Sequence, residues 1–129
     1  MLRITLLAVL LFGVSAVAAD RSGEYEGTYA STDGDSAGKL RIVIQKNSDS
    51  TWRCQVFFTA GGGEVSTKQI SCSADNDTIV TEFDAEVDGS TFHATLKGSA
   101  VDGKTFEGTY TTAGSGGDDQ GKWKVSLRS

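Results

Sequence analysis

The residues nearest to a catalytic arrangement are the only histidine, His93, and the preceding acid Asp84. A histidine oriented by a carboxylate acts as a general base in many hydrolases. Here, the alternation of apolar and polar residues places both side chains on the solvent side of two paired strands, with no nucleophile held nearby. An exposed ion pair is the expected role, and we predict neither a catalytic residue nor an enzymatic activity.

Acidic residues gather in four loops and offer a second kind of chemistry. Such a group could coordinate calcium, attract a cationic ligand or dock a basic secreted protein. No complete calcium-binding loop surrounds them, and one histidine with two cysteines is a poor zinc set. We therefore predict no metal and no cofactor, and leave open whether the loops recognise a partner or are only solvated. The acids are Asp33, Asp35, Glu64, Glu86, Asp88, Asp118 and Asp119.

The two cysteines, Cys54 and Cys72, favour a structural role. Both belong to the inward sets of neighbouring runs, and a turn about Gly61–Gly63 would place them directly opposite each other. Two buried thiols or a redox pair are the alternatives, but the Cys-x-x-Cys spacing of redox sites is absent. We expect a cross-strand disulfide, which is typical of exported proteins.

The first nineteen residues have the pattern of a signal peptide. Arg3 supplies the positive charge, Ile4–Val14 is apolar but too short to cross a bilayer, and small residues end the segment at Val17–Ala19. An uncleaved anchor is the alternative. We predict cleavage before Asp20, one domain over residues 20–129, and a secreted or periplasmic location. Loss of Arg3 changes the formal charge from −5 to −6, which disfavours nucleic acid and anionic membranes as partners.

Eight short runs of strict alternation follow the leader and predict an all-β fold. Abundant glycine and the absence of proline suit tight hairpins. We expect an eight-stranded antiparallel up-and-down β-barrel, closed between its first and last strands so that neither edge is exposed. The predicted inward-facing aromatic residues are Tyr25, Tyr29, Trp52, Phe58, Phe83, Phe92, Phe106, Tyr110 and Trp123.

Turn residues predict the pairing of the later strands. Expected hairpins are centred on Asp75-Asn76, on Asp88-Gly89 and on Val101–Gly103, with Gly103 in a left-handed conformation.

These turns fix which residues face each other across the sheet. They place Asp84 opposite His93 and Lys97 opposite Glu107 on the outer face. On the fourth strand, Ile70, Cys72 and Ala74 should point inward.

An eight-stranded barrel is either filled by its own side chains or wide enough for one small ligand. The inward aromatic residues leave both a packed core and a ligand cup open. If a cup exists, its wall should contain residues that combine an apolar face with a polar tip, namely Tyr25, Tyr29, Tyr110 and Trp123. The meander also gathers the four acidic loops at one end, as a rim around the opening of that cup.

The predicted architecture resembles the calycin barrels, the group of lipocalins, avidins and similar small secreted proteins. In lipocalins a Gly-x-Trp motif opens the first strand. This chain has Gly23-Glu24-Tyr25 there and Gly121-Lys122-Trp123 near its end. The resemblance implies a barrel with a binding cup, and no individual ligand-binding residue carries over.

These patterns together predict an exported binding module. It would hold a small apolar molecule in the barrel mouth or a basic secreted protein at the acidic rim. A structural or solubilising protein of the cell envelope, and an inhibitor of a secreted hydrolase, are the alternatives. No large exposed apolar patch is expected, which favours a monomer.

Overall fold

The computed structural model describes residues 21–34, 36–60, 62–115 and 117–128, and the predicted signal peptide and Asp35 lie outside them. These residues form nine antiparallel strands, so the all-β prediction is confirmed and the predicted count of eight is wrong. No helix among them is long and apolar enough to cross a bilayer. The strands are β1 Gly23–Ser31, β2 Ala37–Lys46, β3 Trp52–Ala60, β4 Gly63–Ser66, β5 Lys68–Ser73, β6 Thr78–Val87, β7 Ser90–Asp102, β8 Thr105–Gly114 and β9 Asp119–Leu127.

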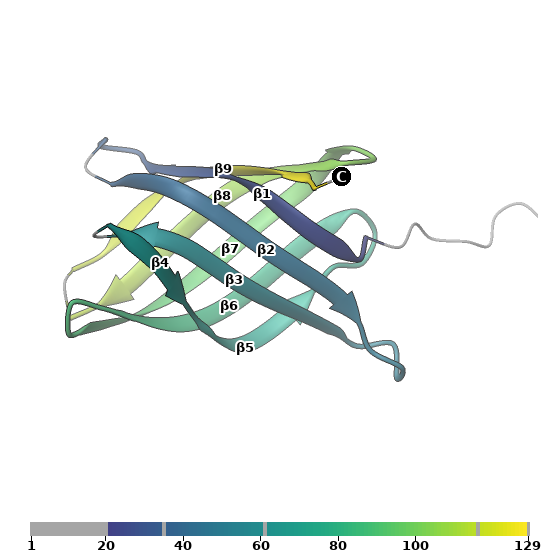
Figure 1. Ribbon diagram of the computed structural model, residues 1–129, viewed down its shortest axis with the longest axis horizontal. Helices are drawn as coiled ribbons and strands as arrows, with labels where there is room; N and C mark the ends of the chain where they lie inside the picture. Colours follow the sequence, from purple (N-terminus) through teal and green to yellow (C-terminus); the bar gives the residue numbers. More distant parts are fainter. Residues whose placement is uncertain (1–20, 35, 61, 116, 129) are drawn as a thin grey trace, which may run out of the picture.

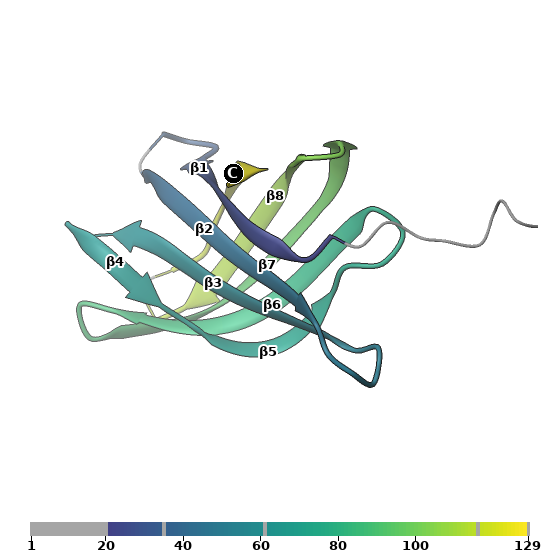
Figure 2. The ribbon, with the colours of Figure 1, turned by 45° about the vertical axis from the view of Figure 1, so that its right-hand side comes forward.

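The strands curl into a nearly closed barrel, in the order β4-β3-β2-β1-β9-β8-β7-β6-β5 (Figure 1). Each strand pairs with its neighbour in the chain, apart from β4 and β5. The first and last strands also pair, with Tyr29 opposite Trp123, as predicted, but β4 and β5 remain edge strands, so the predicted removal of both edges is wrong. The meander places the turns β1–β2, β3–β4, β6–β7 and β8–β9 at one end, and the turns β2–β3, β5–β6 and β7–β8 at the other (Figure 2).

The ninth strand arises because the predicted fourth strand divides at Thr67. Its first part, β4, pairs with β3, whereas its second part, β5, pairs only with β6. The Thr67 hydroxyl donates to the Val56 carbonyl at 2.8 Å as the chain leaves β3. A seam without ladder hydrogen bonds is therefore left between β3 and β5.

Side chains hold this seam together. The disulfide Cys54–Cys72 crosses it with 5.6 Å between the Cα atoms, so the predicted bond is confirmed. The prediction that Cys54 and Cys72 lie directly opposite each other on paired strands is wrong. The β3–β4 hairpin closes at Ala60 and Gly63, and this register directs Gln69 toward Cys54 instead. The Gln69 side-chain oxygen accepts a hydrogen bond from the Cys54 N–H at 2.6 Å.

Two predictions on β5 are wrong for related reasons. Ile70 is half exposed rather than inward, because the pairing with β6 shifts between Gln69 and Ser71. The following turn is centred one residue later than predicted. Asn76 and Asp77 have φ of 55° and 64°, and the Thr78 N–H donates to the Asp75 carbonyl.

The Asp88-Gly89 turn and the pairing of Asp84 with His93 are confirmed. The predicted β7–β8 loop is wrong, since Gly103 does not have a positive φ. The pairing shifts between Ala100 and Asp102 instead. Lys97 consequently faces Thr109 rather than Glu107.

The barrel interior is apolar, and glycine makes room for its largest ring. Gly98 and Gly108 face each other on β7 and β8. A Cβ atom added at Gly98 would lie 2.6 Å from Cζ2 of Trp123, closer than van der Waals contact allows. Trp123 is only 3 % exposed, because it packs into this space.

Candidate functional site

One end of the barrel, here called the base, is closed. Tyr25 packs edge-on against Phe106, with 5.2 Å between ring centroids, and both rings are buried. The Arg21 guanidinium lies over the Phe106 ring and pairs with Asp77 on the β5–β6 turn. Trp52 donates from Nε1 to Asp75 at 2.8 Å on the same turn. Rings and charged groups therefore fill the base.

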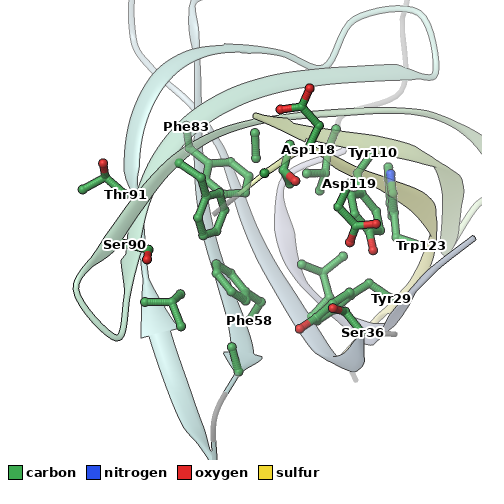
Figure 3. Close-up of a pocket in the computed structure, with 18 of the residues that line it drawn as sticks. Tyr29, Ser36, Phe58, Phe83, Ser90, Thr91, Tyr110, Asp118, Asp119 and Trp123 are labelled. Atoms are coloured by element: carbon green, nitrogen blue, oxygen red, sulfur yellow. The ribbon is translucent and has the colours of Figure 1, made fainter. Parts of the chain in front are cut away.

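The opposite end, here called the mouth, contains an open cavity of about 410 Å³ (Figure 3). That volume lies at the lower end of the range for small-molecule sites. Residues in or directly beside each of the four turns of the mouth line it. The cavity residues are Tyr29, Asp33, Ser36, Leu40, Phe58, Ala60, Phe83, Val87, Ser90, Thr91, Phe92, Ala94, Leu96, Tyr110, Thr112, Gly117, Asp118, Asp119 and Trp123.

Aromatic rings form most of the cavity wall. Phe58 lies 6.0 Å from Phe92 and 6.4 Å from Phe83, measured between ring centroids. Tyr29 meets Phe58 and Tyr110 edge-on, at 6.1 and 5.9 Å. Figure 3 shows Phe58 and Phe83 on one side of the cavity, with Tyr110 and Trp123 on the other. Alternation along the strands places these rings on the inner face.

The polar tips of the wall differ in their hydrogen bonding. The Tyr29 hydroxyl donates to the Thr59 carbonyl at 2.6 Å, and the Trp123 Nε1–H donates to the Thr109 carbonyl at 3.0 Å. The Tyr110 hydroxyl is buried without a hydrogen-bond partner, the only such side-chain atom among the described residues. A buried hydroxyl without a partner lowers the stability of the fold by about 1–3 kcal/mol, so a tyrosine at this position calls for an explanation other than stability.

The cavity is lined by carboxylates, and the described part of the chain places no compensating positive charge in its wall. Asp33, Asp118 and Asp119 line the cavity, and no lysine, arginine or histidine does so among the described residues. Burial, and next the charge of Asp119, raise the pKa of Tyr110 to about 12. The same two causes raise the pKa of Tyr29. The field in the cavity is therefore negative.

Three of the four tyrosine and tryptophan residues predicted for a cup line the cavity: Tyr29, Tyr110 and Trp123. Tyr25 lies in the base instead, where its hydroxyl donates to the Arg21 carbonyl. Sequence reasoning missed Phe58, Phe83 and Phe92 as cavity residues, although it placed them on the inner face. Counting their distance from the mouth turns along each strand would have identified them.

The predicted acidic rim divides into two groups. Asp33, Asp118 and Asp119 face the cavity, whereas Asp88 does not line it and Asp35 lies outside the described residues. Glu64 pairs with Arg41 at 3.0 Å on the outer wall. Only part of the rim is therefore available to a ligand in the cavity.

His93 lies on the outer wall, between two acids. Its Nδ1 is 3.2 Å from Asp84 and its Nε2 is 3.0 Å from Glu82. Hydrogen bonds to Asp84 and then Glu82 raise the pKa of the imidazole. Across the described part of the chain, no three His, Cys, Asp or Glu side chains are grouped to hold a metal ion.

Comparison with known proteins adds information on the fold. No family model matches the chain, and no curated protein matches it. Among solved structures, a redesigned β-barrel is similar, with a TM-score of 0.63 and 15 % sequence identity. The match covers 89 % of this chain and all of the other. At this identity the likeness supports the barrel fold alone.

Proposed function

We propose that this protein is an exported, monomeric binding module that holds a small molecule in the mouth of its barrel. The observation that carries the proposal is the aromatic cavity of about 410 Å³, open at one end and closed at the other. Cavities that bind small molecules are concave and mainly apolar, with a few polar groups that orient the ligand. Tyr110 and the three aspartates supply those groups.

Export is part of the proposal and rests on two features. The leader pattern in residues 1–19 directs a chain to the secretory route. The Cys54–Cys72 disulfide is typical of an oxidising, extracellular-type environment.

Ligand binding is favoured over the other predicted roles by the position of the side chains. Asp33, Asp118 and Asp119 line the cavity and also a groove on the outer wall, so they can serve either a ligand or a docked basic protein, and the aromatic wall of the cavity favours the ligand. A purely structural barrel would gain stability from filling its mouth and from replacing Tyr110 with phenylalanine. His93, the one candidate base, is on the outer wall and away from this cavity.

A matched pair of substitutions on β7 tests the proposal. Ser90 lines the cavity, whereas Ser99 is exposed on the outer face. We expect Ser90→Trp to block the binding of an uncharged aromatic probe, 1-naphthylmethanol, and Ser99→Trp to leave that binding unchanged. Isothermal titration calorimetry on the three proteins measures the difference. Absence of binding to the unmodified protein, or equal binding to both variants, would contradict a site in the mouth.

A further inference from the structure

The lining of the mouth cavity is charged as well as apolar. Its lining combines three carboxylates with no basic side chain among the described residues. None of the ion pairs found in the described part of the chain involves Asp118 or Asp119. The other acids of the mouth end differ: Glu64 is neutralised by Arg41, and Asp88 does not reach the cavity. Negative charge is therefore concentrated where a ligand would enter.

The Tyr110 hydroxyl is a second and independent indication of a ligand. The residue is only 7 % exposed, it lines the cavity, and its hydroxyl has no hydrogen-bond partner in the protein. The neighbouring Tyr29 hydroxyl is already used as a donor to Thr59. A ligand group that reaches Tyr110 would therefore complete the hydrogen bonding of this wall.

The sign of the field decides which group that is. A ligand carboxylate could accept a hydrogen bond from Tyr110, but it would then lie in the field of Asp119 and be repelled. An ammonium group can donate to the Tyr110 oxygen and be attracted by the same carboxylate. The aromatic wall of Phe58, Phe83 and Phe92 favours an apolar or aromatic body and also tolerates a nearby cation.

We propose that the ligand of the mouth cavity is a small organic cation, an ammonium group on an aromatic or apolar body. Asp119 and Tyr110 hold the ammonium group, Asp33 and Asp118 add to the attraction at the opening, and the phenylalanine rings contact the body. This inference rests on the proposed function, because it names the class of ligand for the same cavity.

Three probes of one shape and different charge test the inference on the purified protein. They are 1-naphthylmethylammonium, 1-naphthylmethanol and 1-naphthoate, each titrated by calorimetry at low ionic strength. We expect the cation to bind about fivefold to tenfold more tightly than the alcohol, and the anion to bind most weakly. Added salt should weaken the binding of the cation and leave that of the alcohol unchanged.

Two isosteric substitutions locate the effect. Asp119→Asn should reduce the preference for the cation over the alcohol and leave only the part that Asp33 and Asp118 contribute. Asp88→Asn removes the same charge from the same end of the barrel, outside the cavity, and should leave the preference unchanged. Tyr110→Phe should weaken the cation more than the alcohol. Circular dichroism confirms the fold of each variant, and Asp118→Asn replaces Asp119→Asn if the latter does not fold.

The outcomes separate the two proposals. If the alcohol or the anion binds as tightly as the cation, or if Asp88→Asn acts like Asp119→Asn, the charge preference is wrong and the cup remains. If none of the three probes binds, the cup itself is wrong and the inference fails with it.

Discussion

The base and the mouth of this barrel are built from the same aromatic residue types, yet they use them differently. In the base, Phe106 is 1 % exposed and Tyr25 is 2 % exposed, and Arg21 covers the Phe106 ring. In the mouth, Tyr29, Phe58 and Phe92 are only partly buried and surround a cavity. The polar tips differ too, because the Tyr25 hydroxyl is bonded and the Tyr110 hydroxyl is not. The side chains of the base are fully packed and hydrogen-bonded, which stabilises the fold. The mouth keeps an unfilled cavity and a hydroxyl without a partner, and both are suited to binding a ligand.

The largest difference is expected from removing one ring at each end. Phe106→Ala should cost about 3–5 kcal/mol of unfolding free energy, because the packed base cannot close around the lost volume. Phe92→Ala, in the open mouth where the ring is only partly buried, should cost only about 1 kcal/mol. Chemical denaturation of both variants measures the two values. Equal losses would show that the mouth is packed as tightly as the base.

The seam between β3 and β5 gives the next effect. Replacing both cysteines by alanine should lower the unfolding free energy by about 3 kcal/mol, since the disulfide closes an 18-residue separation and no ladder joins these strands. Urea unfolding of the double variant measures the loss. A change below about 1 kcal/mol would mean that the Gln69 and Trp52 hydrogen bonds hold the seam without the disulfide.

A smaller effect is expected at Gly98, whose missing side chain leaves room for Trp123. Gly98→Ala should cost about 1–3 kcal/mol, because the new methyl group meets the Glu107 carbonyl oxygen and the Trp123 ring. Gly103→Ala is the control, since it has open space and no positive φ, and it should change stability by less than about 0.5 kcal/mol. Thermal unfolding compares the two. A neutral Gly98→Ala would indicate that both the Glu107 backbone and the Trp123 ring can shift away from the new methyl group.

The two mouth tyrosines should respond with opposite signs to loss of the hydroxyl. Tyr29→Phe leaves the Thr59 carbonyl without its donor and should destabilise the protein by about 1 kcal/mol. Tyr110→Phe removes a hydroxyl without a partner and should stabilise it by about 1 kcal/mol. Denaturant midpoints at equal slope provide the measurement. Destabilisation by Tyr110→Phe would show that this hydroxyl is satisfied in the free protein.

The smallest effect on stability is expected on the outer wall, where it can be measured through the titration of His93. Its folded-state pKa lies above the ordinary value of 6.5 because Asp84 and Glu82 favour the charged form. The stabilisation is therefore complete below the unfolded pKa and is lost as the pH rises through the higher folded pKa. As the pH is lowered from about 8 to about 6, we expect the unfolding free energy of the parent protein to rise slightly relative to that of His93→Gln. An NMR titration of the imidazole with a pKa below 6.5 would contradict this.

Much of the fold could be predicted from the alternation, because it fixes which face each side chain occupies. The burial of Tyr25, Trp52 and Phe106 follows from it, as does the pairing of β1 with β9. The turn Asn76-Asp77 could not be distinguished from Asp75-Asn76, since all three residues tolerate a positive φ.

Other features depend on contacts that alternation does not encode. The pairing shift that exposes Ile70 arises where β5 leaves β3 for β6, and the sequence there has no glycine or proline to mark it. The choice between a packed core and a cup depends on how far each ring lies from the mouth. The alternation carries no information on that distance, so it cannot separate Tyr25 from Tyr29, although the two residues lie in different halves of the barrel.

The two tryptophans allow a direct test, because Trp52 lies in the base and Trp123 lines the mouth cavity. Each indole N–H gives one resolved signal in a proton–nitrogen NMR spectrum. On titration with 1-naphthylmethylammonium, we predict that the Trp123 signal shifts in proportion to occupancy while the Trp52 signal stays in place. A shift of Trp52 alone, or of neither signal, would contradict a binding site in the mouth of the barrel.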